Sequence, residues 1–255
     1  MKNYLLKIII LSFVFSPYTL SQKWKLRRYE FMVGIGSANY FGDIGGSATE
    51  KNLFGLNDID IESTRPSIYV GARFKIKSNI HIKVNFISGW LSGSDQNSQF
   101  DYRNFHFKSF IQEYSVMGEY YFMEEEKKFR STAAFNRRGM INDFSRISAY
   151  VSAGMGGFYF NPKLDADFTD RNETPEYYSG YSKVALAIPA SIGIKYILDS
   201  KWALGFELGG RFTTTDFLDG FKSFYSKAND IYYFSSVSLI YRIKTDRRGR
   251  PLLFQ

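Results

Sequence analysis

Residues 184–198 read VALAIPASIGIKYIL, and this stretch decides the expected fold. Every even-numbered position in it is apolar, whereas the odd positions from 183 to 195 carry lysine, proline or small residues. Successive side chains of a β-strand point to opposite faces of the sheet, so one face here is apolar and the other small or charged. This pattern is typical of a membrane β-barrel, which has lipid outside and a polar interior.

Seven more segments show the same alternation, and each is long enough to cross a membrane when tilted, which takes about nine to eleven residues. The chain has 255 residues and 18% aromatic residues, as expected for one large β domain with aromatic girdles. The predicted strands are Tyr29–Tyr40, Pro66–Ile76, His81–Leu91, Lys108–Phe122, Ser145–Phe160, Ser182–Leu198, Trp202–Thr213 and Asp230–Ile243.

The lengths of the connections predict the topology. Short turns around residues 77–79 and 199–201 alternate with long connections after the first, third, fifth and seventh strands. Outer-membrane barrels have short periplasmic turns and long extracellular loops, so we expect an all-β, eight-stranded antiparallel transmembrane outer-membrane β-barrel with both termini in the periplasm. The segment Met123–Phe144 is an exception, because it is long yet periplasmic by count. A soluble β-sandwich is the alternative, but it does not explain the alternating loop lengths.

The N-terminus has the features of a secretory signal peptide. Lys2 and Lys7 precede or flank the apolar stretch 8–14, and residues 19–21 form a small-residue cleavage site. The apolar stretch is too short for an anchoring helix. The expected organisation is therefore a signal peptide (1–21), a barrel (22–243) and a basic periplasmic tail (244–255). Without cysteine the chain has no disulfide and no thiolate metal site.

Charged residues on the inward parity are expected to meet inside the barrel. Eight strands leave an interior just wide enough for side chains, and unpaired buried charges are costly. We therefore expect a filled lumen held by ion pairs rather than an open pore. The expected lumen charges are Arg73, Lys75, Lys83, Glu113, Glu119, Lys195, Glu207 and Arg211.

Two loop motifs have a functional and a structural interpretation. Residues 38–46 (ANYFGDIGG) are rich in glycine, but a phosphate site needs a helix start just after the loop, and a tight turn at the barrel mouth fits better. Asp216 and Asp219 could bind a cation, but calcium loops need more oxygen ligands at set spacing, and a capped turn packing onto the mouth fits better. We expect no cofactor and no metal.

The two histidines are expected at opposite ends of the barrel, His81 at a periplasmic turn and His106 in an extracellular loop. They cannot form one site together. His106 with Asp95 or Asp101 could form an enzyme's acid–base pair. No recognisable constellation singles these residues out, so we expect a protein that is not an enzyme.

The periplasmic side is expected to be strongly basic, although the whole chain carries a net charge of only +8. Like charges gathered in one place steer association with an acidic surface, and an apolar residue in the tail adds an anchor. We expect a periplasmic protein partner, and no nucleic acid or small-molecule substrate. The residues expected to bind that partner are Lys127, Lys128, Arg130, Arg137, Arg138, Arg247, Arg248, Arg250 and Phe254.

Several stretches resemble the PorG-like outer-membrane β-barrel family of the Bacteroidetes, domain of unknown function 6089. They are residues 27–30 (RRYE), 39–46 (NYFGDIGG), 210–219 (GRFTTTDFLD) and the closing strand from Tyr232 to Arg242. The residues that match the family motifs are Tyr40, Gly42, Asp43, Gly45, Gly46, Arg211, Asp216 and Asp219.

This resemblance implies a component of the type IX protein secretion system. The barrel would sit among outer-membrane lipid and tie a periplasmic ring of PorK- and PorN-like lipoprotein components to the membrane. The alternative is a stand-alone surface barrel that binds a ligand or partner through its extracellular loops.

Overall fold

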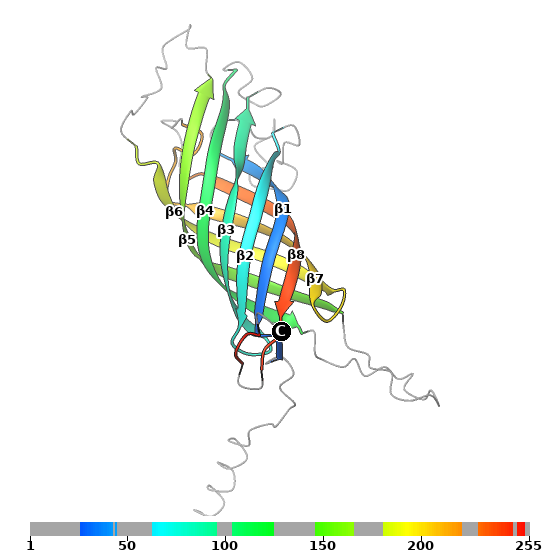
Figure 1. The fold of residues 1–255 in the computed structure, drawn as a ribbon. Helices are drawn as coiled ribbons and strands as arrows, with labels where there is room; N and C mark the ends of the chain where they lie inside the picture. Colours follow the sequence, from blue (N-terminus) through cyan, green and yellow to red (C-terminus); the bar gives the residue numbers. More distant parts are fainter. Residues whose placement is uncertain are drawn as a thin grey trace, which may run out of the picture.

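The computed structural model describes residues 26–42, 44, 63–95, 104–124, 146–165, 181–220, 229–246 and 249–252. They form a closed antiparallel barrel in which each strand pairs with the next and β8 pairs with β1 (Figure 1). Within the described residues, no helix is long and apolar enough to cross a membrane. The strands are β1 (Tyr29–Phe41), β2 (Arg65–Lys75), β3 (Ile80–Ser94), β4 (His106–Met123), β5 (Ile147–Asp165), β6 (Val184–Ile197), β7 (Trp202–Thr213) and β8 (Ile231–Ile243).

The predicted fold class is confirmed, and the largest differences lie where β3, β4 and β5 extend further than expected. Residues 161–165 lack a clean alternation in sequence, but they pair with the beginning of β4. The prediction for His106 was therefore wrong. It opens β4 instead of lying in a loop, because its backbone is held between Ser94 of β3 and Asp165 of β5.

The period of two places one set of side chains on the outside and the other inside. Along β6 the exposed positions are the even-numbered residues, and Leu186 has 64% of its surface exposed. On the opposite parity Ala187 and Lys195 have no more than 1% exposed. All eight strands therefore present large apolar side chains on the outer wall, which is the arrangement expected for contact with lipid.

The two ends of the barrel differ in their connections. Short turns at 76–79 and 198–201 lie at the end where both β1 begins and β8 finishes, which we call the turn end (Figure 1). At the opposite end, which we call the loop end, β1, β3, β5 and β7 finish and β2, β4, β6 and β8 begin. In the 198–201 turn the carboxylate of Asp199 accepts hydrogen bonds from the backbone N–H groups of Trp202 and Lys201, at 2.7 and 2.5 Å. These two bonds lower the pKa of Asp199.

Pro189 stands in the middle of β6, where a central strand normally excludes proline because it lacks an N–H. The ladder between β5 and β6 is interrupted at this point, with paired residues on either side at Ala153↔Ala190 and Gly156↔Ala187. The ladder with β7 continues through Pro189, which lies opposite Arg211. Side chains of β6 therefore alternate between the outside and the inside of the barrel on both sides of Pro189.

The apolar outer wall predicts the effect of placing a charge on it. Leu239 is 44% exposed and lies between Val33 of β1 and Leu204 of β7. We expect Leu239→Arg to destabilise the barrel in a bilayer by about 2–4 kcal/mol, because the charge would lie in hydrocarbon. Urea unfolding of the protein in lipid vesicles measures this change. Ser200→Arg in the turn adds the same charge outside the strands, and equal unfolding midpoints for the two variants would contradict a lipid-facing wall.

Candidate functional site

The interior nearest the turn end is organised around the carboxylate of Glu30 from β1. This side chain is fully buried and lies 2.8 Å from Nη1 of Arg73 and 3.1 Å from Nζ of Lys195. Lys75 and Arg242 complete its surroundings, at 3.2 and 3.6 Å. One carboxylate therefore faces four cations from β2, β6 and β8, and strands that are far apart around the barrel meet at this residue.

The network continues across the lumen through shared partners. Arg73 also donates from Nε and Nη2 to Glu119 of β4, at 2.5 and 3.0 Å. Lys83 of β3 joins Glu119, at 3.3 Å, to Glu207 of β7, at 2.5 Å. The Glu207 carboxylate accepts two further hydrogen bonds, from Tyr150 and Ser191. Because each charge has partners, the burial cost of an isolated ion is largely offset.

A second charged pair lies nearer the loop end. Nε of Arg211 is 3.2 Å from Oε2 of Glu113, and the hydroxyl of Tyr232 donates to the same oxygen at 3.0 Å. The guanidinium also donates to the carbonyl of Gly209 and lies over the ring of Phe234. The buried guanidinium of Arg211 is thus held by an ion pair with Glu113, a hydrogen bond to a backbone carbonyl and the face of the Phe234 ring.

Above this pair, apolar side chains fill the barrel toward the loop end. Phe158 and Tyr232 meet edge to face, with ring centroids 5.5 Å apart. Together with the charged network, this layer fills the interior formed by the described strands. The buried members toward the loop end are Ala38, Ile44, Leu91, Phe105, Phe107, Ile111, Phe158, Phe160, Ala187, Leu218, Tyr232 and Phe234, and the same apolar cluster extends toward the turn end through Met32, Tyr69, Ile87, Ala203 and Ile240.

Residues of two distant sequence motifs meet at the loop end. The hydroxyl of Tyr40, on the inward face of β1, hydrogen-bonds to Oδ2 of Asp219 at 2.8 Å and to Oδ1 of Asp230 at 2.7 Å. Asp230 also accepts the backbone N–H of Leu218. A Cβ at position 42 would lie 1.9 Å from the Tyr40 hydroxyl, so Gly42 leaves the space that this contact needs. The cluster ties the β7–β8 connection to the end of β1.

The structure places the eight charges expected in the lumen inside the barrel: Arg73, Lys75, Lys83, Glu113, Glu119, Lys195, Glu207 and Arg211. Sequence reasoning missed Glu30 and Arg242 as members of this set. The signal was available in each case, since Glu30 shares its parity with Met32 and Ala38, and Arg242 with Ile240. In the sequence analysis Glu30 appears only within the family motif at residues 27–30.

The two histidines lie at opposite ends of the barrel, His81 near the turn end of β3 and His106 at the loop end of β4. His81 belongs to β3, not to a turn, and its Nδ1 lies 3.7 Å from Glu119 in the lumen. The Nε2 atom of His106 lies 3.2 Å from the side-chain oxygen of Asn104. Among the described residues no group of three or more His, Asp or Glu side chains could hold a metal ion. Asp101 lies outside the described residues.

The turn end carries an excess of positive charge outside the lumen. Its described cations outnumber its carboxylates by seven to three, whereas the loop end has four cations and five carboxylates. The turn-end cations are Arg27, Arg28, Lys77, Arg146, Lys201, Lys244 and Arg250, and its carboxylates are Glu124, Asp199 and Asp246. The loop-end set is Arg65, Lys108, Lys163 and Lys183 with Asp95, Asp165, Asp216, Asp219 and Asp230. The barrel is therefore electrically asymmetric along its axis.

Several residues singled out in the sequence lie outside the described residues. Of the predicted partner-binding set, only Arg250 is described, and it is exposed. The remaining members are Lys127, Lys128, Arg130, Arg137, Arg138, Arg247, Arg248 and Phe254, and the family-motif residues Asp43, Gly45 and Gly46 also fall outside.

A family model described as "Domain of unknown function (DUF6089)" matches residues 6–246. The chain belongs to this family. The match covers all eight strands, so the buried network and the loop-end cluster both lie within the DUF6089 region. No match to a curated protein was found.

Solved barrels of similar architecture have very different sequences. Neisserial surface protein A matches with 9% identity and a TM-score of 0.46, covering 84% of this chain and 96% of that protein. The outer membrane protein OprG from Pseudomonas aeruginosa matches with 9% identity, a TM-score of 0.37, and coverage of 86% and 98%. The outer membrane enzyme PagL matches with 11% identity, a TM-score of 0.31, and coverage of 85% and 99%.

The pair of Lys83 and Glu207 predicts a strongly coupled double substitution. We expect Lys83→Met to cost about 3–5 kcal/mol, because it leaves a buried carboxylate without its cation. The added Glu207→Leu change should restore part of that loss, giving a coupling energy of about 0.5–3 kcal/mol in a double-mutant cycle of unfolding free energies. Lys201→Met, at an exposed turn, serves as the control for losing a lysine. Strict additivity of the two lumen substitutions would contradict the network.

The loop-end cluster predicts a specific role for one hydroxyl group. We expect Tyr40→Phe to lower the unfolding free energy by about 1–3 kcal/mol, because the buried pair of Asp219 and Asp230 loses the one hydroxyl hydrogen that lies between them. Tyr114→Phe removes a hydroxyl from the outer wall, where the side chain is 62% exposed, and should change stability by less than about 0.5 kcal/mol. Denaturant unfolding of both variants in the same vesicles makes the comparison, and equal losses would argue against the cluster.

Proposed function

We propose that this protein is an outer-membrane barrel of the type IX protein secretion system that anchors a periplasmic ring of PorK- and PorN-like lipoproteins. Its role is structural and not enzymatic. The barrel fixes the position in the membrane through its apolar outer wall, and its turn end, with both termini, faces the periplasm and holds an acidic surface of the ring. The resemblance to PorG-like barrels suggests the partner, and the charge at the turn end carries the proposal.

The excess of cations at the turn end supports docking because charge of one sign steers association with a complementary surface. Arg27, Arg28 and Lys244 lie next to one another at this end, where the N-terminal segment meets the chain after β8. The filled lumen offers no evident route for a cargo through the described part of the barrel, which favours an anchoring role over a conducting one.

The chain after β8 folds back on the barrel, which gives the docking surface a defined shape. The N–H of Thr245 donates to the carbonyl of Leu26 at 2.9 Å, and Thr245 forms a β-bridge with Pro251. Gly249 adopts a positive φ of 80° in the turn between them, and a Cβ there would lie 2.8 Å from Nη1 of Arg28. Residues 244–246 and 249–252, which we call the C-terminal hairpin, are therefore joined to residues 26–28 as one composite surface.

A second candidate is a surface barrel that binds a ligand or partner through its loops. The observation that favours it is the loop-end cluster, in which the family-motif residues Tyr40, Gly42 and Asp219 meet. The same cluster also has a purely structural effect, because it ties the β7–β8 connection to β1. We therefore place this candidate second.

Reversal of charge at the turn end tests the anchoring role. A chain carrying Arg247→Glu, Arg248→Glu and Arg250→Glu should fold but recover far less of the ring lipoproteins when the tagged barrel is purified from gently solubilised envelopes. Recovery by the unaltered chain should also fall as the salt concentration rises, because exposed charges are screened beyond about 8 Å at physiological ionic strength. Mass spectrometry of the purified material identifies and counts the ring proteins.

The matched control reverses three exposed cations at the loop end, with Lys108→Glu, Lys163→Glu and Lys183→Glu. Ring recovery should be unchanged in this variant, and the gel mobility of unheated samples verifies that both variants are folded. Normal ring recovery with the turn-end variant would contradict anchoring through this surface. Loss of a binding partner only in the loop-end variant would support the surface barrel instead.

A further inference from the structure

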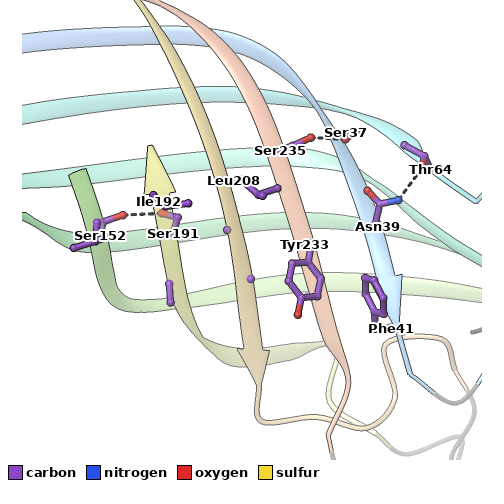
Figure 2. A pocket seen from close by; sticks show the side chains of 14 residues that line it. Ser37, Asn39, Phe41, Thr64, Ser152, Ser191, Ile192, Leu208, Tyr233 and Ser235 are labelled. Carbon is purple, nitrogen blue, oxygen red and sulfur yellow. Dashed lines mark hydrogen bonds between the residues drawn. The ribbon is translucent and has the colours of Figure 1, made fainter. Parts of the chain in front are cut away.

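The outer wall contains a shallow furrow of about 720 Å³ that crosses five strands, from β1 through β8, β7 and β6 to β5 (Figure 2). This volume lies within the range of roughly 300–1,000 Å³ that is typical of sites for small molecules. Most of the side chains that line the furrow belong to the outward parity of their strands, so it opens on the same wall as the exposed apolar residues.

Small residues in register produce the floor of this furrow. Ser37 lies opposite Ser235, and Gly210 lies opposite Ala190 in the neighbouring pair of strands. Leu208 lies opposite Ser235, and Tyr233 lies opposite Gly210, so the two small pairs stand on neighbouring register levels with these larger residues beside them. Short side chains next to long ones leave a depression whose sides can make dispersion contacts with a hydrocarbon chain.

The β1 end of the furrow is polar although it lies on the outer wall. The hydroxyls of Ser37 and Ser235 are 2.6 Å apart, and the amide of Asn39 donates to Oγ1 of Thr64 at 2.7 Å (Figure 2). The two serines share one hydrogen bond, so a second hydroxyl hydrogen can be donated outward, and the Asn39 amide has donor and acceptor capacity beyond this one bond. Polar groups of this kind are costly against hydrocarbon unless they find a partner.

We propose that the furrow is a binding site for one membrane lipid. The acyl chain lies along the floor from Gly210 to Ala190, and the ester or hydroxyl groups at the head of the lipid bond to Ser37, Ser235 and Asn39. The furrow is continuous with the lipid-facing wall. Its outward side chains are polar at the β1–β8 end and apolar at the β5–β6 end (Val151, Ala190 and Ile192), where the lining serines Ser152 and Ser191 are buried and bond to each other, so the two ends match the two halves of an amphiphile. This inference rests on the membrane location in the proposed function, but not on the secretion partner.

Retention of lipid by the full-length barrel tests the site. The protein is reconstituted in nanodiscs of palmitoyl-oleoyl phosphatidylethanolamine, then transferred to a mild detergent, and the bound lipid is counted by native mass spectrometry. We expect one lipid to remain on the unaltered barrel. Ala190→Leu fills the floor and should weaken retention about tenfold, which is the effect of losing a few methylene contacts. Ser37→Ala with Ser235→Ala should weaken it through the polar end.

Ala72→Leu is the matched control, because Ala72 is also exposed on the outer wall but lies on β2, away from the furrow. Equal retention by the Ala190 and Ala72 variants, or a barrel that inserts in nanodiscs and keeps no lipid, would overturn the site. A barrel dimer that Ala190→Leu dissociates would also overturn it, in favour of a second copy in the furrow. Failure of the barrel to insert in nanodiscs would instead count against the proposed membrane location. The secretion role is tested separately, by recovery of the ring lipoproteins.

Discussion

The structure depends on the pairing of opposite charges inside a closed barrel of eight strands. Such a barrel has room for side chains but little for water, so every inward charge needs a partner within the barrel. Glu30 is the shared partner of four cations, and Arg73 and Lys83 extend the network across the lumen to Glu119 and Glu207. Backbone hydrogen bonds between neighbouring strands close the barrel. The charged network links strands that are not hydrogen-bonded to each other.

The interior is built in two layers with different physical roles. The charged layer near the turn end is stabilised by directional bonds, whereas the layer near the loop end is stabilised by burial of aromatic and aliphatic side chains. Arg211 lies between them and uses both kinds of contact, an ion pair with Glu113 and the ring face of Phe234. A lumen filled in this way gives a rigid support for surfaces at its ends, which suits an anchoring protein.

The functional proposals use the outside of the molecule. The turn end presents positive charge on a composite of the N-terminal segment and the C-terminal hairpin, and the outer wall presents a furrow with one polar end. The proposals assign different chemistry to these two features, an acidic protein surface to the first and a membrane lipid to the second. They lie on separate faces, so a substitution in one is expected to leave the other intact.

Because alternation is a local property of the backbone, the period-two pattern was enough to predict the eight strands, their order and most of the inward charges, although Glu30 and Arg242 were missed. It did not reveal which inward charges pair. Glu30 and Glu207 are 177 positions apart in the chain yet belong to one network, and only the closure of the barrel brings them together. The same holds for Tyr40 with Asp219 and Asp230, and for Ser37 with Ser235. Strand register and barrel closure decided these contacts, since they set which distant residues share a level of the wall, and the sequence by itself determined only which face each residue occupies.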